Sequence, residues 1–383
     1  MKVGLLTRDY PPDVHGGAGV HVEFLARELR ELADVEVHCW GDGEAEGVLR
    51  HRPARELAGA DDALRALSVE LAMAAEVRGR DLVHSHTWYA HLAGHLAKLL
   101  HGIPHVVTAH TLRPAAPGSA GGHAIADWAQ RTAVESADAV VTVSHRMRAG
   151  VLAAHPAVDP ARVRVIRGGV DTLLYRPDHG TDALERIGLD PEHPFVLSVG
   201  RTGHRKGVHH LLRAARAFDP DARLVLCTGS HGTPDTSAGL RELVTELERV
   251  RDGVHWIPRV LPRAQIIQLM THAAVFVCPS VREPLGTAGL EAMACGTAVV
   301  APAAGGIPEL VDDGSTGLLV PYDADRPEAY ESGLTQAVNR VLDDPPQAAR
   351  MGAAGRRRAV RDFGWDRAAK RTHALYEELL GRA

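Results

Sequence analysis

Short runs of apolar and β-branched residues alternate with longer segments of helical period along the whole chain. This alternation is typical of βαβ units, in which crossover helices join the strands of a parallel sheet. A helix is expected from Val20 to Leu32, because its apolar residues recur at helical spacing. Strands of the first half are expected at 3–6, 35–39, 82–84, 105–108, 139–143 and 163–166.

The alternation stops in a stretch rich in turn residues, from Gly168 to Gly180, and then restarts. Strands of the second half are expected at 195–198, 222–228, 254–257, 274–278, 298–301 and 317–320. A chain of 383 residues has the right length for two such domains. The predicted fold class is therefore α/β, with two Rossmann-like parallel-sheet domains. We expect an N-terminal domain at 1–170, a C-terminal domain at 171–363, and a last helix within 364–383 that returns to the N-terminal domain.

Composition excludes several partners. The net charge is only −5 and the arginines are dispersed among acidic residues, so a nucleic-acid partner is not expected. No window approaches the ~20 apolar residues of a membrane span, and the first apolar run is too short for a signal peptide. The four cysteines form no C-x-x-C pattern and are expected to be buried thiols. These features favour a cytoplasmic protein, and they leave a homodimer open.

The first candidate binding loop is Gly16-Gly17-Ala18-Gly19, between the first strand and its helix. In open α/β sheets, ligands bind beyond the carboxyl ends of the strands. Glycines at this point let backbone N–H groups approach an anion at the helix N-terminus. The pattern is not G-x-G-x-x-G, which argues against a nicotinamide cofactor. A tight turn that simply needs glycine is the alternative.

The second candidate loop runs from Gly200 to Gly207, between a buried strand and a helix expected at 208–217. Arg201 and Lys206 are cations held in this glycine-bounded turn. Fixed positive charge of this kind would stabilise a departing diphosphate. The alternative is a solvated basic turn, but a chain with so few lysines retains one here.

The third candidate loop contains two carboxylates, Glu283 and Glu291, on either side of a Pro-Leu-Gly turn. A carboxylate can accept hydrogen bonds from two hydroxyls, so one could hold a sugar and the other a ribose diol. The backbone N–H groups from Leu285 to Thr287 would meet a phosphate at the start of the next helix. Taken alone, Glu291 could equally be a solvated helical residue.

Histidines at the ends of expected strands suggest a metal site. His84-Ser85-His86 has the form of an H-x-H ligand pair, and His110 follows the next strand. A metallohydrolase would need carboxylates at later strand ends, and the first half offers only Asp138, at the start of a strand. Asp323-Ala324-Asp325 has the form of a metal-binding D-x-D, but it occupies a polar turn. We therefore expect these histidines to pack or to bind sugar hydroxyls, with no metal.

Taken in order, the three loops resemble those of the retaining glycosyltransferases of the two-Rossmann (GT-B) fold, family 4. Short segments narrow the resemblance to the short glycogen synthase and maltose-1-phosphate synthase branch. They are Tyr10-Pro11-Pro12, Gly16 to His21, His84 to Tyr89 and Leu290 to Cys295. The resemblance covers essentially the whole chain. It implies two domains facing each other across a cleft.

In the C-terminal half, the resemblance implies a complete site for a nucleotide diphosphate sugar. Arg201 and Lys206 would bind the diphosphate, and Glu291 the ribose. The donor hexose would contact Glu283 and the amides of Leu285, Gly286 and Thr287.

In the N-terminal half, the resemblance implies that Gly16 and Gly17 approach the donor phosphates and that His110 binds the sugar near its 6-hydroxyl. Transfer in this family retains the anomeric configuration and needs no metal or other cofactor. The departing phosphate oxygen takes the proton of the acceptor.

The segment after His110 departs from the pattern of the branch. It reads Thr111 to Gly122 with several glycines and prolines, where the branch carries a Trp, a Lys, a Glu and a Gln. Arg282 also stands where Tyr is common, and Gly289 replaces an Asn. These changes leave the donor diphosphate residues intact and affect the acceptor side and the recognition of the base.

The sequence therefore predicts a retaining hexosyltransferase that moves a hexose, with glucose favoured, from an ADP-, UDP- or GDP-sugar. The acceptor would be a sugar, a sugar phosphate or an α-glucan hydroxyl. A diverged relative that glycosylates a specialised small molecule is one alternative. A non-catalytic nucleotide-sugar-binding protein is a second alternative, and a nicotinamide oxidoreductase is a third.

Overall fold

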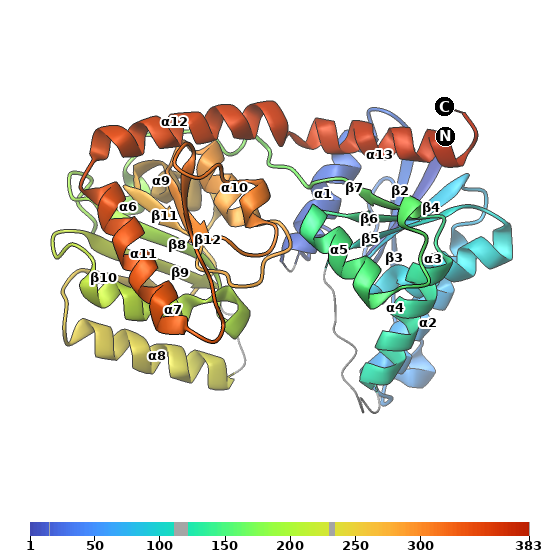
Figure 1. The fold of residues 1–383 in the computed structure, drawn as a ribbon. Coiled ribbons are helices and arrows are strands. Elements are labelled where there is room, and N and C mark those ends of the chain that lie inside the picture. The colour runs from blue at the N-terminus through green and yellow to red at the C-terminus, as the bar shows by residue number, and fades with distance from the viewer. Residues whose placement is uncertain (15, 111–121, 230–233, 383) are drawn as a thin grey trace. The chain divides into compact units, whose positions relative to one another are not determined.

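A computed structural model describes residues 1–14, 16–110, 122–229 and 234–382. The chain folds into two compact units. Unit 1 consists of Met1–Gly169 with Trp365–Ala383, and unit 2 consists of Val170–Gly364. Each unit has one parallel sheet with helices on both faces, which confirms the predicted α/β class with two Rossmann-like domains (Figure 1). No helix among these residues is long and apolar enough to cross a membrane.

The sheet of unit 1 has seven parallel strands in the order β3-β2-β1-β4-β5-β6-β7. Their bounds are β1 Lys2–Leu6, β2 Asp34–Trp40, β3 Val48–His51, β4 Leu82–His86, β5 His105–Ala109, β6 Ala139–Thr142 and β7 Val163–Val165. The strand order reverses beside β1, since β2 and β4 lie on its two sides. Such a reversal opens a crevice at the carboxyl ends of the strands, where ligands bind.

Helices cover both faces of this sheet. Their bounds are α1 Gly17–Leu29, α2 Asp62–Glu76, α3 Trp88–His101, α4 Gly122–Ser136, α5 His145–Ala154 and α13 Trp365–Leu379. The last helix, α13, belongs to unit 1 because its aromatic residues are buried there. Trp365 stacks on Phe24 of α1 with ring centroids 5.9 Å apart, and the Tyr376 hydroxyl lies 2.6 Å from His84 Nδ1.

The sheet of unit 2 has six parallel strands in the order β10-β9-β8-β11-β12-β13. Their bounds are β8 Phe195–Arg201, β9 Arg223–Gly229, β10 Val254–Ile257, β11 Val275–Val277, β12 Val299–Pro302 and β13 Gly317–Val320. The order again reverses, here beside β8, which pairs with β9 and with β11. The loops after β8 and β11 therefore leave the sheet side by side, at the carboxyl ends of the strands.

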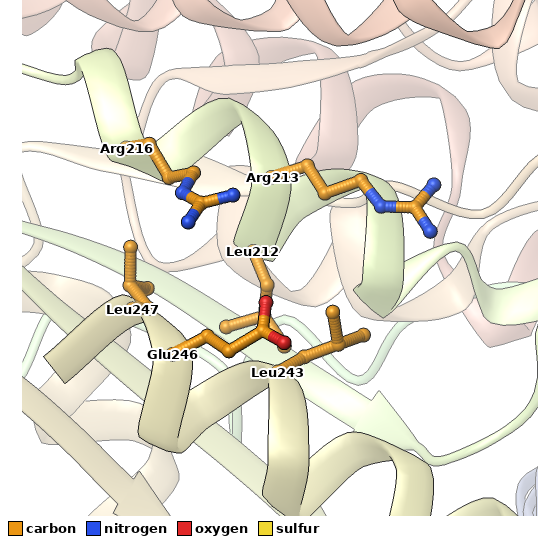
Figure 2. Close-up of a pocket in the computed structure, with 6 residues that line it drawn as sticks. All are labelled: Leu212, Arg213, Arg216, Leu243, Glu246 and Leu247. Atoms are coloured by element: carbon orange, nitrogen blue, oxygen red, sulfur yellow. The ribbon is translucent and has the colours of Figure 1, made fainter. Parts of the chain in front are cut away.

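The helices of unit 2 are α6 Asp182–Glu185, α7 Val208–Ala214, α8 Pro234–Glu248, α9 Arg263–His272, α10 Thr287–Ala294, α11 Pro327–Leu342 and α12 Pro345–Asp362. Leucines of α7 and α8 pack together over the sheet. The hollow that remains between these helices, shown in Figure 2, has a volume of only about 10 Å³. This is the space of at most about one water molecule, so it is no substrate site.

Some local features differ from the prediction. The edge strand β3 was missed, because its four residues include Arg50 and His51 and carry no clear apolar period. Strand β4 was predicted to end at His84 but continues through His86, since both histidines are buried. Helix α1 begins at Gly17 rather than Val20. The second glycine of the first loop therefore lies in the first turn of the helix.

Candidate functional site

In unit 2, the loop after β8 holds both predicted cations. Arg201 is the last residue of the strand, is exposed, and has no ion-pair partner among the described residues. Lys206 closes a single 3-10 turn, His204–Lys206, that leads into α7. Gly207 follows with a φ of 65°, and a Cβ at this position would collide with the carbonyl oxygen of Pro279. Only glycine at this position allows the loop after β8 to come so close to the loop that contains Pro279.

Lys206 and Glu283 lie together, although they are far apart in the sequence. The Nζ atom of Lys206 lies 2.6 Å from Oε2 of Glu283, and the side chains are 31% and 13% exposed. The resemblance had assigned the first to the diphosphate and the second to the hexose. An ammonium group has three donors, so Lys206 can bind Glu283 and still offer N–H groups to phosphate oxygens.

The backbone of the Glu283 loop rests on two glycines that the sequence analysis missed. Gly305 has a φ of 62°, and a Cβ there would collide with the backbone of Glu283. The N–H of Gly306 donates to the Glu283 carbonyl oxygen at 2.8 Å. A Gly-Gly pair two residues after the end of strand β12 was the signal that could have revealed this support.

The predicted amide donors lie at the N-terminus of helix α10. Gly286 precedes the helix with a φ of 106°, and Thr287 is its first residue. Leu285 is 3% exposed, so its side chain anchors the turn in the core. The first N–H groups of a helix have no partner within it, and the helix dipole favours an anion at that end. The turn is thus suited to hold a phosphate or a sugar hydroxyl.

Glu291 lies one turn further along α10, near the hydroxyl of Tyr175, a residue that was not predicted from the sequence. Burial raises the pKa of Glu291 to about 7, although the Tyr175 hydroxyl and the charge of Arg263 act to lower the pKa. The backbone carbonyl of Tyr175 is in turn held by Arg356 at 2.6 Å. The carboxylate is therefore positioned to accept bonds from a diol.

In unit 1, the two glycines of the first loop have different roles. Gly16 precedes α1 with a φ of 89°, a conformation that glycine adopts without cost. Gly17 has no atom within 4 Å of the position that a Cβ would occupy. The backbone conformation of the turn explains why residue 16 is a glycine. The open space beside Gly17 leaves room for a ligand at the helix N-terminus.

His110 directly follows β5 and contacts His86, the last residue of the neighbouring strand β4. His86 Nδ1 lies 3.0 Å from His110 Nε2. Burial lowers the pKa of His110 to about 4, so the ring is neutral at pH 7. His84, two residues before His86, is bonded at both nitrogens, to Tyr376 and to Thr108, and has a structural role.

The residue after His86 has an unusual backbone conformation. Thr87 has a φ of 66°, the only positive value among the described non-glycine residues. Such a conformation costs about 1–3 kcal/mol and is found mostly at functional sites. Thr87 also directly precedes helix α3. The strain therefore makes the carboxyl end of β4 a candidate functional position of unit 1.

A cavity of about 610 Å³ lies in unit 1 at the carboxyl ends of β1, β2 and β3. Its volume is within the range of small-molecule sites. Trp40 lines it, and the guanidinium of Arg8 lies 5.5 Å from the centre of the Trp40 ring. Arg52 and Arg55 also line the cavity. Arg52 is paired with Asp42, while Arg55 has no ion-pair partner in the part of the chain that the structure describes.

Other candidates from the sequence have structural explanations or lie outside the described residues. Asp138 is paired with Lys98 at 2.7 Å, and Asp323 is bonded to Arg326 and to the N–H of Asp325 within its own turn. The four cysteines are buried and unpaired, as predicted. The divergent segment 111–121 lies outside the described residues.

Family models match both halves of the chain. Residues 15–173 match the model described as Glycosyltransferase Family 4, and residues 181–358 match the model described as Glycosyl transferases group 1. The two matches correspond closely to the first part of unit 1 and to unit 2.

Curated relatives are similar over the full length. The chain is 49% identical to the alpha-maltose-1-phosphate synthase of Mycolicibacterium smegmatis and 47% identical to that of Mycobacterium tuberculosis. Each of these matches covers 99% of this chain and 100% of the relative. The D-inositol 3-phosphate glycosyltransferase of Thermomonospora curvata is 32% identical, over 94% of this chain and 86% of the relative.

Solved structures share the fold. The sucrose-phosphate synthase of Thermosynechococcus elongatus has a TM-score of 0.82 at 24% identity and covers 100% of both chains. The catalytic domain of starch synthase IV from Arabidopsis thaliana, bound to ADP and acarbose, has a TM-score of 0.78 at 17% identity over 99% of both chains. The chain thus belongs to the GT-B glycosyltransferases of family 4, in the branch of the maltose-1-phosphate synthases.

Proposed function

We propose that this enzyme transfers glucose from a nucleoside diphosphate glucose to a phosphorylated sugar, with retention of configuration and without a metal ion. The donor binds unit 2 and the acceptor binds unit 1. The observation that carries the proposal is the contact of Lys206 with Glu283, two residues from separate loops at one edge of the unit 2 sheet.

The groups at the carboxyl ends of β8 and β11 suit a diphosphate leaving group. Arg201 and Lys206 provide two positive charges, and the N-terminus of α10 provides backbone N–H groups. Charge that is fixed before the reaction stabilises the developing anion without reorganisation. Glu291, near the Tyr175 hydroxyl, offers a carboxylate for the two ribose hydroxyls. These groups together account for the diphosphate and the ribose of the donor.

The proposed reaction breaks the bond between C1 of the donor glucose and the β-phosphate oxygen. The acceptor hydroxyl oxygen forms the new bond to C1 on the same face, and its proton passes to the departing phosphate oxygen. The products are a nucleoside diphosphate and a disaccharide phosphate.

A phosphorylated acceptor is supported by the names of the relatives and by the cavity of unit 1. Maltose 1-phosphate is glucose joined to glucose 1-phosphate, so a synthase of that product adds glucose to glucose 1-phosphate. In the cavity, the Trp40 ring provides an apolar surface and Arg55 an unpaired cation. Arginine binds phosphate with two parallel hydrogen bonds.

The test is a panel of ADP-, UDP- and GDP-glucose, each with α-glucose 1-phosphate, inositol phosphate or a short α-glucan as acceptor. Mass spectrometry identifies the product, and NMR of the new anomeric proton gives its configuration. The proposal expects an α-linked disaccharide phosphate, at an unchanged rate after treatment with a chelator. Transfer only to the glucan or only to inositol phosphate would refute the acceptor, and a β-linked product would refute retention.

A variant tests the cavity directly. Arg55→Ala should raise the KM for glucose 1-phosphate by about 10-fold or more, since a hydrogen bond to a charged group contributes about 1.5–3 kcal/mol. The KM for the donor should not change. Arg78→Ala is the matched control, because Arg78 is also exposed in unit 1 but does not line the cavity. Equal effects of the two variants would exclude the cavity as the acceptor site.

A further inference from the structure

Three histidines of unit 1 converge from three different elements. His21 belongs to α1, His86 ends β4, and His110 follows β5. One ring nitrogen from each lies within 4.8 Å of the others. The register explains part of this approach, since β4 and β5 are parallel neighbours with His86 opposite Thr108, two residues before His110. We call these residues the histidine triad.

The spacing of the three rings matches that of imidazoles around one metal ion. Their centroids are 4.8, 5.3 and 5.6 Å apart. Three imidazoles on a tetrahedral ion have centroids about 5 Å apart, because each nitrogen lies about 2 Å from the metal. Packed aromatic rings without a metal show similar distances, so the spacing alone does not decide between the two.

One ring nitrogen of the triad is buried without a partner. His84, just outside the triad, is bonded to hydroxyls at both nitrogens. His86 Nδ1 contacts His110, whereas His86 Nε2 is fully buried and, like His105 Nδ1 nearby, has no hydrogen-bond partner among the described residues. A buried nitrogen without a partner costs about 1–3 kcal/mol. Coordination of a metal through this nitrogen would remove that cost.

The surroundings of the triad fix its rings and leave one side open. Trp365 holds the His21 ring in place through an edge contact with centroids 4.9 Å apart. His110 is partly exposed, so an ion can enter from its side.

We propose that the histidine triad binds a divalent transition ion such as Zn²⁺ or Co²⁺, and that this ion inhibits glucose transfer by capturing His110. Three nitrogen ligands suit these ions, whereas Mg²⁺ and Ca²⁺ prefer oxygen. Three protein ligands also leave the fourth position of a tetrahedral ion to water. Metal binding itself is independent of the proposed function, and only the inhibition rests on it.

The binding test uses the full-length protein after removal of metals with a chelator. Titration with Co²⁺ should give one bound ion with the visible absorption of a four-coordinate cobalt site, and Zn²⁺ should displace it while Mg²⁺ should not. His21→Phe keeps the ring beside Trp365 but removes the ligand, and should weaken binding by at least about 100-fold. His86→Asn is the second variant, for use if the first fails to fold.

The control is His193→Asn, which removes an exposed histidine paired with Asp190 and therefore a typical surface site for adventitious metal. It should leave the cobalt spectrum unchanged. Binding that persists in His21→Phe and His86→Asn, or that disappears in His193→Asn, would overturn the assignment of the triad.

The inhibition test compares transfer with and without Zn²⁺. Wild-type transfer should stop as the site fills and should recover when a chelator is added. The residual activity of His21→Phe should not respond to Zn²⁺ at the same concentration. Stoichiometric Zn²⁺ binding without inhibition would refute the capture of His110. A protein that binds Co²⁺ at the triad but transfers no glucose under any condition would refute the proposed function and not the metal site.

Discussion

Replacement of Lys206 by alanine separates the role of this residue in catalysis from its role in stability. The variant removes the 2.6 Å contact between Lys206 and Glu283. The Lys206 side chain is 31% exposed and that of Glu283 is 13% exposed. Ion pairs with this degree of exposure contribute about 0–1 kcal/mol to stability. The melting temperature should therefore fall by no more than about 2–4 °C for a domain of roughly 200 residues. Removal of a donor that stabilises the leaving group should lower kcat by about 10²–10³, equivalent to about 3–4 kcal/mol.

The matched control is Lys98→Ala, because Lys98 forms a similar pair in unit 1. Its Nζ atom lies 2.7 Å from Asp138, and the two side chains are 30% and 31% exposed. This variant should show a similar thermal shift with an unchanged kcat. The assay is steady-state release of nucleoside diphosphate, combined with calorimetry of both variants. A loss in kcat of less than about threefold for Lys206→Ala, or an equal loss for Lys98→Ala, would refute the assigned role.

Three other predictions concern the remaining groups. Since burial raises the pKa of Glu291 to about 7, the carboxylate forms as the pH rises through 7. Donor affinity should therefore increase about tenfold from pH 6 to pH 8, and Glu291→Gln should show no such dependence in calorimetric titrations. Burial raises the pKa of Glu70 to about 8 from 4.5, so its contribution to stability is present below pH 4.5 and is lost as the pH rises to 8. Urea unfolding should show that Glu70→Gln gains stability relative to the wild type across this range, and parallel curves would contradict the reasoning. Gly305→Ala should destabilise the protein by about 2 kcal/mol or more and abolish donor binding, whereas Gly203→Ala, with open space around its Cβ, should be stable in the same thermal melts.

The fold was largely predictable because its signals are local. Alternating strands and helices, and a restart after a turn-rich stretch, are visible within short windows of sequence. Strand β3 was not predicted, because its four residues lie at the edge of the sheet and include the polar residues Arg50 and His51. The end of β4 was likewise predicted too early, because histidines are not expected in a buried strand. Here they are buried, since the hydroxyl partners of His84 come from β5 and α13.

The candidate site was predictable only in part, because its contacts join distant residues. Glycine loops and cations at the ends of strands identified the relevant positions, but the pair of Lys206 with Glu283 depends on the adjacency of β8 and β11. Tyr175 had no distinguishing pattern of its own. Its place beside Glu291 depends on the packing of unit 2.

The histidine triad shows the same limit more clearly. The sequence suggested His84, His86 and His110 as possible ligands, whereas the structure groups His86 and His110 with His21 from α1. In a strand, residues two apart share a face, but hydroxyl groups nearby bind both nitrogens of His84. The identity of the third member depends on tertiary packing against Trp365, which the spacing of residues does not encode.

The central claim is that Arg201 and Lys206 bind the diphosphate of the donor. Isothermal titration of ADP, UDP and GDP into the wild type and into the double variant Arg201→Ala/Lys206→Ala tests it most directly. Two lost hydrogen bonds to charge, at about 1.5–3 kcal/mol each, predict that the preferred nucleotide binds the double variant more than about 100-fold more weakly. Equal affinity for the two proteins would contradict the account.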